Sequence, residues 1–371
     1  MKKNEEYIVT CIDDTDLNSG VVKIDDMVVF VPNLLIGEKA KIKIVKVNKK
    51  YAFGIIIELL KPSINRQELT CEVAKTCGGC QLQHMSYAYQ LDYKYKHVKK
   101  LFEDIEVKPI LGMDNPWYYR NKAQFPVKIK DGKVQMGFYR QHSNDVVTCK
   151  ECKIQDHVIN EVFSFIQKKI TLKMAQDLRH VFIRHSSTDE IQVVFIGKNE
   201  KNIISLSDQL KNTFANIKSI VFNYNTRNDN VILGDTYKVL YGNDSIIEEC
   251  LGNKVKLHFK AFFQVNPKQM EVLYSQAIKA ANLSGNETCI DMYAGTGTIG
   301  MAVSQHAKSV IGVEIVKEAV DNANDNTKMN HLDHCHYVCQ DATDFAHDHK
   351  EDRIDVIFID PPRKGMTENG I

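Results

Sequence analysis

Residues 7–60 consist of short runs in which hydrophobic and polar positions alternate. Turn-forming residues such as Asn, Gly, Asp and Pro separate these runs, which is the pattern of short strands joined by tight turns. The predicted strands are YIVTCID, GVVKID, MVVFVP, KAKIKIVKV and YAFGIIIELL. Five short strands with this spacing predict a small β-barrel of the oligonucleotide-binding type.

One amphipathic helix and a β-hairpin are predicted after the barrel. Residues 85–102 place Tyr, Leu and Val at helical spacing, which predicts an amphipathic helix. Residues 123–130 and 134–142 flank an Asp-Gly turn and predict a β-hairpin. From 155 to 250, helical and strand-like segments alternate without a chemical motif, so we interpret this stretch as a scaffold that shapes the substrate groove.

Residues 289–314, CIDMYAGTGTIGMAVSQHAKSVIGVE, predict a strand, a glycine turn, a helix and a second strand. Glycines in the turn tolerate positive φ and let a ligand approach the backbone. The first strand leads into Asp291 and the second ends on Glu314, where an acid is well placed to hold a ribose. The pattern predicts a nucleoside-cofactor site in a doubly wound sheet.

The letters G-x-G-x-x-G also fit a dinucleotide fingerprint, but two carboxylates favour a different cofactor. Asp291 precedes the turn, where it would repel a pyrophosphate and attract a sulfonium or amino group. Asp360 follows the apolar run 354–359 and begins a stiff Asp-Pro-Pro turn, which suits positioning a planar base beside a methyl donor. The residues therefore favour S-adenosylmethionine, with an NAD-dependent oxidoreductase as the alternative.

Gln264 and Asn266 stand where a strand gives way to a helix, in the segment FFQVNPKQM. Pro267 fits the first turn of that helix. Polar amides at such a corner can bind the amino-acid end of a cofactor. The competing interpretation is that Asn266 only caps the helix.

Composition limits the partners that the chain can have. Its 371 residues allow two or three domains, and its net charge is +1. An RNA-binding surface must therefore be local. No run approaches the roughly eighteen apolar residues of a membrane span, and the N-terminus lacks an apolar signal region, so a cytosolic protein is expected, as a monomer.

Two stretches interleave basic residues with apolar or aromatic ones. Lys41 and Lys43 alternate with isoleucines in the fourth predicted strand, which puts both lysines on one sheet face where phosphates could bind. Arg120, Lys122 and Arg140 lie among aromatic residues around the hairpin, which suits stacking of unpaired bases and contact with phosphates. The alternatives are a solvated strand face and an exposed hairpin without a ligand.

Cysteine spacing indicates a metal site. A reducing compartment would keep most of the ten cysteines as thiols or metal ligands. Three of them have the spacing C-x5-C-x2-C, with two glycines that let the thiolates bend toward one centre. Spacing alone does not separate zinc from an iron–sulfur cluster, and four buried free thiols are the alternative. The residues concerned are Cys71, Cys77 and Cys80, with Cys149 and Cys152 as candidates for the fourth ligand.

These motifs resemble those of the TRAM-domain RNA uracil-5-methyltransferases, which use S-adenosylmethionine to make 5-methyluridine in ribosomal or transfer RNA. The resemblance covers nearly the whole chain in the family's order. Its parts are GVVKIDDMVVFVPNLLIGE, C-x5-CGGCQLQH, YRNKAQF, GFYRQHSNDVV, FFQVN, DMYAGTGTIG, GVEIVKEAV and DPPRKG. The implied fold class is α/β with an all-β N-terminal barrel. The implied domains are an OB-like TRAM domain (1–62), an α+β central domain that holds an iron–sulfur site and binds RNA (63–252), and a Rossmann-like class I methyltransferase domain (253–371).

The resemblance also implies ligands and a partner. A [4Fe–4S] cluster would be bound by four cysteines, with Cys149 as a bystander. The partner would be RNA, with 23S ribosomal RNA favoured over transfer RNA. The implied cluster ligands are Cys71, Cys77, Cys80 and Cys152. The implied contacts of S-adenosylmethionine are Gln264, Tyr293, Glu314 and Asp360.

In this family a cysteine thiolate adds to uracil C6 so that C5 can take the methyl group, and a glutamate then removes the C5 proton. Both residues lie downstream of the DPPR motif in the family, so here they are expected beyond Ile371, in a part that is missing from an incomplete methyltransferase domain. Cys335 and Cys339 are expected only to pack. A catalytically inert fragment that binds S-adenosylmethionine and RNA is one alternative. Another is an amino-methyltransferase, although Arg363 stands where such a site needs an aromatic residue.

Overall fold

The computed structural model describes residues 1–363, 365 and 366, and the chain divides into two compact units. The first unit comprises Met1–Pro116 and Phe138–Cys149, and the second comprises Trp117–Gly137 and Lys150–Ile371. The three-domain division stays a prediction. Lys364 of the DPPRKG motif and the last predicted positions of the third domain, 367–371, lie outside the described residues. In the described part of the chain, no helix has the length and apolar character needed to cross a membrane.

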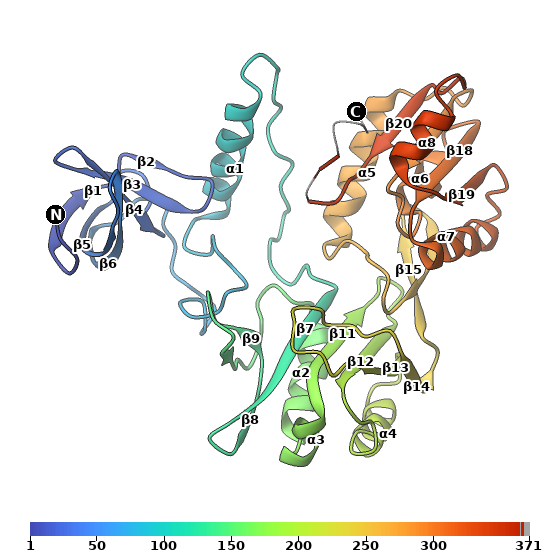
Figure 1. Ribbon diagram of the computed structural model, residues 1–371, viewed down its shortest axis with the longest axis horizontal. Helices are drawn as coiled ribbons and strands as arrows, with labels where there is room; N and C mark the ends of the chain where they lie inside the picture. Colours follow the sequence, from blue (N-terminus) through green and yellow to red (C-terminus); the bar gives the residue numbers. More distant parts are fainter. Residues whose placement is uncertain (364, 367–371) are drawn as a thin grey trace. The chain divides into compact units, whose positions relative to one another are not determined.

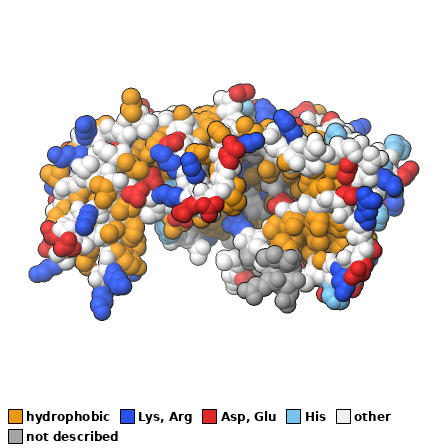
Figure 2. All heavy atoms as spheres, turned by 90° about the horizontal axis from the view of Figure 1, so that it is seen from above, with side chains coloured by type: hydrophobic (Ala, Val, Ile, Leu, Met, Phe, Trp, Pro, Cys, Tyr) orange, Lys and Arg blue, Asp and Glu red, His pale blue; other side chains and the backbone are white. Residues whose placement is uncertain are grey.

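One six-stranded sheet forms most of the first unit and confirms the predicted all-β N-terminal region (Figure 1). Its order is β1-β5-β6-β4-β3-β2, and neighbouring strands are antiparallel except β4 and β6, which are parallel. Val29, Ile42 and Ala52 are fully buried in the core, as the alternation of hydrophobic and polar residues predicts. Figure 2 shows that hydrophobic side chains also remain outside, among lysine and arginine side chains at the left of the view. The strands are β1 (Glu6–Thr10), β2 (Asp13–Asp14), β3 (Ser19–Ile24), β4 (Met27–Pro32), β5 (Lys39–Val47) and β6 (Tyr51–Lys61).

The predicted helix after the barrel is confirmed as α1 (Tyr87–Leu101). The Ser86 side chain caps its first turn. The Tyr93 hydroxyl accepts a hydrogen bond from the Asn18 N–H at 3.0 Å, which ties the helix to the barrel. The segment between the barrel and the helix carries three of the predicted cluster cysteines. Because α1 is itself bonded to the barrel, both ends of this segment are anchored in the first unit.

A second six-stranded sheet, in the order β14-β13-β12-β11-β7-β8, lies in the second unit. Only β12 and β13 are parallel within it. Three helices pack against this sheet, which confirms the alternation predicted for this stretch. The strands are β7 (Lys122–Lys130), β8 (Lys133–Met136), β11 (Leu178–His185), β12 (Ile191–Gly197), β13 (Ile217–Tyr224) and β14 (Tyr237–Gly242), and the helices are α2 (His157–Lys169), α3 (Leu172–Asp177) and α4 (Ile204–Thr213).

The predicted hairpin is shorter than its sequence pattern suggested. Strands β7 and β8 pair across the Asp-Gly turn, but β8 ends at Met136 instead of continuing to residue 142. Beyond Gly137 the chain enters the first unit, where β9 (Phe138–Tyr139) pairs with β10 (Val146–Val147). A residue run that looks like one strand therefore serves two separate sheets.

A hairpin and a long helix lead to the last sheet. Strands β15 (Ser245–Cys250) and β16 (Asn253–His258) are antiparallel, and α5 (Pro267–Ala281) follows them. Buried residues of the hairpin and of α5 form one core with Met301. The strand-to-helix corner around Gln264 is therefore fixed on both sides by packing.

The last sheet consists of parallel strands in the order β19-β18-β17-β20, as expected for a doubly wound sheet (Figure 1). Two helices, α6 and α7, pack on one face, and α8 packs on the other. The strand order reverses between β17 and β20, and ligands of such sheets bind at the carboxyl ends of the strands where this happens. The strands are β17 (Thr288–Met292), β18 (Ser309–Glu314), β19 (Cys335–Cys339) and β20 (Val356–Ile359), and the helices are α6 (Thr298–Ser304), α7 (Lys317–Met329) and α8 (Ala342–Asp348).

Candidate functional site

Three carboxylates meet at the carboxyl edge of the last sheet. Asp291 lies near the end of β17, Glu314 ends β18, and Asp360 directly follows β20. Asp291 is 1% exposed, and this burial raises the pKa of its carboxyl to about 7, with the charges of Asp360 and Glu314 acting in the same direction. Because such charges act only over short distances, the structure brings together three acids that the sequence singled out.

Only one of the two carboxylate oxygens of Asp291 accepts a hydrogen bond from the described residues. Its Oδ2 accepts a hydrogen bond from the Gly300 N–H at 2.8 Å, whereas Oδ1 is buried and has no partner among the described residues. A buried carboxylate oxygen without a donor is unfavourable. The site is therefore suited to a ligand that brings a positive charge or an N–H group.

The backbone holds the Glu314 carboxylate by both of its oxygens. The Gly295 N–H donates to Oε2 at 3.0 Å, and the Val316 N–H donates to Oε1 at 2.9 Å. Each oxygen keeps a further lone pair for a donor from a ligand. Two adjacent hydroxyl groups, as a ribose has, match this arrangement.

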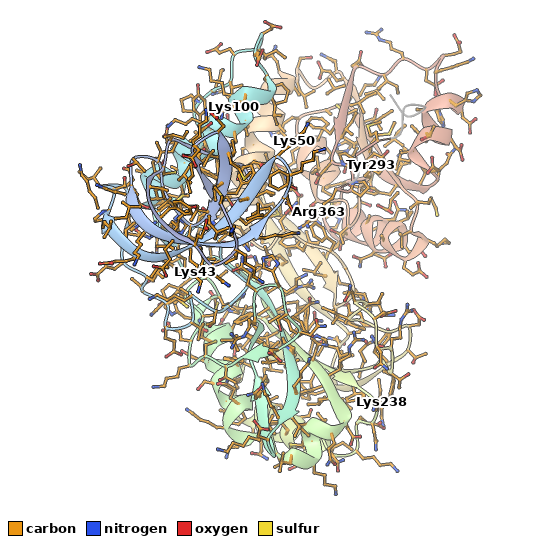
Figure 3. All side chains as sticks on the ribbon, turned by 60° about the vertical axis from the view of Figure 1, so that its left-hand side comes forward. Lys43, Lys50, Lys100, Lys238, Tyr293 and Arg363 are labelled. Carbon is orange, nitrogen blue, oxygen red and sulfur yellow. The ribbon has the colours of Figure 1, made fainter. Side chains whose placement is uncertain are left out.

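The turn between β17 and α6 runs through the left-handed region of φ. Tyr293 has φ 65°, Gly295 has 55° and Gly297 has 81°. A tyrosine in this region is uncommon. Its position is fixed by the next residue, because the Ala294 N–H donates to the Val313 carbonyl oxygen at 3.0 Å. Tyr293, labelled in Figure 3, is half-buried and lies two residues after Asp291.

Tyr337 on β19 fills the space beneath this turn. It is 4% exposed, and its hydroxyl donates to the Gly297 carbonyl oxygen at 2.7 Å. A Cβ at Gly297 or Gly300 would lie 2.6 or 2.5 Å from atoms of Tyr337. The glycines are thus required by packing as well as by ligand approach. Sequence reasoning missed Tyr337, because nothing in its local pattern sets it apart from other strand residues.

Hydrogen bonds to the backbone hold the corner that carries Gln264. The Asn121 N–H donates to the Val265 carbonyl oxygen at 3.0 Å. Asn266 caps α5 by accepting the Gln269 N–H at 3.2 Å, so the capping interpretation holds for that residue. Gln264 itself is half-buried and precedes α5 by three residues.

The same helix faces the acidic site through Tyr274. Burial raises the pKa of Tyr274 to about 12, and the charges of Asp360 and Asp291 contribute to this shift. The Tyr274 hydroxyl also lies 3.5 Å from the Thr298 hydroxyl at the start of α6. Helix α5 therefore connects the Gln264 corner to the carboxylates. Tyr274 was not identified from the sequence.

A buried arginine joins this corner to the central sheet. Arg184 on β11 is 1% exposed and donates to the carbonyl oxygens of Ala261 (2.9 Å) and His258 (3.3 Å). Burial lowers the pKa of Arg184 to about 10, against the favourable charge of Glu248, which is fully buried. Both residues fall in the stretch interpreted only as scaffold. Charged residues inside apolar strands were the signal that could have identified them.

Two of the predicted RNA contacts lie beside that arginine. Burial lowers the pKa of Lys122 to about 8, and the charges of Arg184 and Arg120 add to the effect. The Lys122 Nζ and the Arg184 Cζ lie 5.9 and 5.1 Å from the centre of the Phe182 ring. The Nε of Arg120 is buried without a hydrogen-bond partner among the described residues. Arg140 is not part of this group, because it belongs to the first unit and forms a β-bridge with Cys77.

The predicted cluster ligands are divided between the units. Cys71, Cys77 and Cys80 lie in the first unit and Cys152 lies in the second, where its N–H donates to Asn160 Oδ1 at 2.8 Å. Burial raises the pKa of the Cys77 thiol, and the nearby charge of Cys71 adds to this. Within residues 1–363, 365 and 366, no group of three or more His, Cys, Asp or Glu side chains is arranged to hold a metal ion.

Two family profiles match the chain. The TRAM domain profile matches residues 3–57, and the profile described as conserved hypothetical protein 95 matches residues 271–368. An RNA methyltransferase of Halalkalibacterium halodurans is 41% identical over 391 aligned positions, which cover 99% of this chain and 85% of that protein. An RNA methyltransferase of Clostridium tetani is 37% identical, with coverage of 100% and 84%.

A solved structure has the same fold along nearly the whole chain. The transfer RNA (uracil-54, C5)-methyltransferase of Pyrococcus abyssi, determined with S-adenosyl-L-homocysteine, superposes with a TM-score of 0.74. The alignment covers 98% of this chain and 85% of that one, at 24% sequence identity. At this identity the likeness establishes the fold, including the α/β class with an N-terminal β-domain.

Proposed function

Because the chain belongs to the TRAM-domain RNA methyltransferase family of these relatives, we propose that it transfers a methyl group from S-adenosylmethionine to carbon 5 of a uridine in RNA. One observation carries the choice of cofactor: Asp291, Glu314 and Asp360 converge beside a glycine turn at the switch point of the last sheet. A cationic ligand with a ribose satisfies these groups, whereas the pyrophosphate of a dinucleotide would be repelled by them.

Each residue of this site takes a role that follows from its position. The Glu314 oxygens, already oriented by two backbone N–H groups, accept the ribose hydroxyls. Asp291 and Asp360 attract the positive charges of the ligand, and Tyr293 offers an aromatic face at the turn. The Gln264 amide binds the amino-acid end. S-adenosylmethionine, when bound, supplies the methyl group on a positively charged sulfur.

The uridine assignment is supported by the motif resemblance and by the fold shared with the Pyrococcus abyssi enzyme, whose name specifies uracil C5. We propose cytosolic 23S ribosomal RNA ahead of transfer RNA as the substrate. Arg120 and Lys122 would contact its phosphates, because they supply positive charge next to the corner that carries Gln264.

A methyl-transfer assay tests the proposal. The chain is incubated with S-adenosylmethionine carrying a labelled methyl group and with 23S ribosomal or transfer RNA transcripts, and the RNA is digested to nucleosides. Calorimetry with S-adenosylmethionine and, as the matched ligand control, NAD is run on the same preparation. S-adenosylmethionine is expected to bind and NAD is not, and any label that is transferred is expected in 5-methyluridine. Binding of NAD instead, or label in another nucleoside, would contradict the proposal.

The nucleophile is tested separately. In the proposed reaction a thiolate forms a bond to C6, C5 takes the methyl group, the C5 proton leaves to a base, and the sulfur–C6 bond breaks. Burial raises the pKa of Cys335 to about 11 and that of Cys250 to about 12, which suits neither as a thiolate. With RNA containing 5-fluorouridine, a covalent adduct on a denaturing gel would identify a nucleophilic cysteine within the 371 residues. No adduct, with normal cofactor binding, would indicate an inert binding protein.

A [4Fe–4S] cluster on Cys71, Cys77, Cys80 and Cys152 remains part of the proposal. It is supported by the mutual proximity of Cys71 and Cys77 and by the Gly79 N–H, which points at Cys77 Sγ across 3.4 Å. Amide donors to sulfur are common around such ligands. Iron content after purification without air tests it, with Cys80→Ser expected to lose iron and Cys149→Ser, as control, to keep it. An iron-free parent protein would contradict this part.

A further inference from the structure

The chain just before β7 forms hydrogen bonds with two different segments of the second unit. The carbonyl oxygen of Arg120 accepts the Asp156 N–H at 3.0 Å, which bonds it to the start of α2. The next residue bonds elsewhere, because the Asn121 N–H donates to the Val265 carbonyl oxygen at 3.0 Å. Val265 directly follows Gln264. The backbone at Arg120 is therefore linked directly to the segment that carries the proposed cofactor contact.

The side chain of Asn121 is fixed as well. It is 6% exposed, and its Nδ2 donates to Oε2 of Glu248 at 3.5 Å. Glu248 is fully buried, and its other oxygen accepts the Ser187 N–H at 2.8 Å. The Asn121 carbonyl oxygen accepts the His185 N–H at 2.9 Å. Asn121 is thus held by its N–H, its carbonyl oxygen and its side chain, so the position of the donor to Val265 depends on all three bonds.

Positive charge is concentrated beside this link. Arg120 and Lys122 flank Asn121 in the sequence. Burial lowers the pKa of Lys122 to about 8, and the charges of Arg184 and Arg120 contribute to this, so the three cations lie close together. Like charges in a partly buried site repel one another, and an anion that binds to them offsets the repulsion.

The segment from Ala261 to Val265 is bonded to this group at both ends. The Arg184 guanidinium donates to the Ala261 carbonyl oxygen at 2.9 Å, and the Asn121 N–H donates to the Val265 carbonyl oxygen. Gln264 lies between these two bonds. A segment that one ligand has already ordered loses less conformational freedom when a second ligand binds, so the second ligand binds more tightly.

We propose that an RNA phosphate bound at Arg120 and Lys122 tightens cofactor binding at Gln264, with Asn121 as the positioning residue that links the two sites. The phosphate offsets the repulsion among the cations and fixes the backbone on both sides of Asn121, so that the Gln264 corner is ordered before the cofactor arrives. Linkage requires the converse, that bound cofactor tightens RNA binding by the same factor. The inference rests on the proposed function for the identity of both ligands. A network that served folding alone would produce no such coupling.

Calorimetry on the full chain tests the coupling. S-adenosylhomocysteine is titrated with and without a saturating single-stranded oligouridine at matched ionic strength. Because its sulfur carries no charge, direct attraction between a sulfonium and the RNA phosphates does not contribute. Oligouridine is expected to tighten its binding about 5- to 150-fold, the range of typical coupling between two sites. Anisotropy of labelled oligouridine, with and without S-adenosylhomocysteine, should give the same factor.

Two buried asparagines provide a variant and its matched control. Asn121→Ala removes the bond to Glu248 and should bring the coupling factor toward one, while the affinity for oligouridine alone stays near that of the parent. Asn225 is 4% exposed, and its Nδ2 donates to the carbonyl oxygens of Val231 and Ile232 at 2.9 and 2.8 Å, in the loop after β13. Asn225→Ala should keep the parental coupling factor, although it also loses buried hydrogen bonds.

Hydrogen exchange on the parent protein provides a check that needs no substitution. Oligouridine alone should slow the exchange of the Asn121 amide, because that N–H is the donor to Val265. Unchanged exchange of this amide would overturn the proposed link even if Asn121→Ala fails to fold.

Two further results would overturn the inference and leave the proposed function intact. The first is an S-adenosylhomocysteine affinity that saturating oligouridine leaves unchanged or weakens, although each ligand binds by itself. The second is a coupling factor that is the same in Asn121→Ala and Asn225→Ala. A parent protein that does not bind S-adenosylhomocysteine, or does not bind oligouridine, would overturn the proposed function and the inference with it.

Discussion

The guanidinium of Arg184 donates to the carbonyl oxygen of Ala261 at 2.9 Å, and this bond joins the central sheet to the segment that leads to Gln264. The same guanidinium bonds the carbonyl oxygen of His258. A side chain that belongs to one sheet therefore sets the backbone path into the cofactor corner of the next.

Replacing Arg184 by methionine should strongly destabilise the second unit. The change leaves two carbonyl oxygens without donors and the fully buried Glu248 without its opposite charge. Each buried polar group left without a partner typically costs about 1–3 kcal/mol. Denaturant unfolding measures the loss, and Lys173→Met on the exposed surface of α3 is the control. A loss no larger than that of the control would show that Arg184 does not hold the corner.

Cofactor affinity should rise with pH around neutrality. The pKa of Asp291 is raised to about 7, so the carboxyl becomes negatively charged, and attractive to a cation, as the pH increases through this value. Folding stability changes with pH in the opposite direction to cofactor affinity. A raised carboxyl pKa favours folding at low pH, and this contribution is lost as the pH rises from the ordinary value of 3.8 to about 7. Calorimetry across this range should show tighter binding at higher pH, and Asp291→Asn should remove the dependence.

Alanine at position 297 should cost more than alanine at another left-handed glycine. Gly297 has φ 81°, and a Cβ there would lie 2.6 Å from the Tyr337 ring. Gly132, with φ 71°, has no atom within 4 Å of an added Cβ and serves as the matched control. We expect about 1–2 kcal/mol for Gly132→Ala from backbone conformation. A further roughly 1–3 kcal/mol is expected for Gly297→Ala from overpacking. If thermal unfolding shows equal losses of stability for the two variants, the added Cβ at position 297 does not clash with Tyr337.

RNA affinity should fall as the pH rises from 7 to 9. The lowered pKa of Lys122, about 8, means that its positive charge is lost over this interval. Anisotropy at constant ionic strength measures the effect. Lys122→Arg keeps its charge throughout and should bind independently of pH, whereas Lys122→Gln should bind weakly at every pH. A parent protein with a flat profile would mean that Lys122 does not contact the RNA.

Local patterns predicted the elements of the fold and the acids of the site. The ends of β17, β18 and β20 could be read from apolar runs, so Asp291, Glu314 and Asp360 were identified before their proximity was known. Parallel strands bring their carboxyl ends to one edge, which is why this inference succeeds. The aromatic contact of Phe30 with Phe53 was not predicted, because register between distant strands depends on the whole barrel.

Contacts between distant segments set the limit of sequence reasoning. Arg184 and Glu248 look like ordinary charged residues of scaffold strands, and only the fold shows that both are buried and that the charge of Glu248 favours the charged form of Arg184. The hairpin was predicted too long because the chain changes units at Gly137, and alternation of polar and apolar residues carries no information about which sheet a strand joins. Similarly, Cys152 could be named as a ligand only from the resemblance.

The switch point between β17 and β20 has a consequence for synthesis on the ribosome. Asp291 and Asp360 come from adjacent strands in space, yet β18 and β19 are made between them. A parallel pair of this kind closes a long loop and forms late. The ligand pocket is thus completed only when β20 joins β17, and occupancy by the cofactor would mark a nascent chain in which β20 has already been inserted.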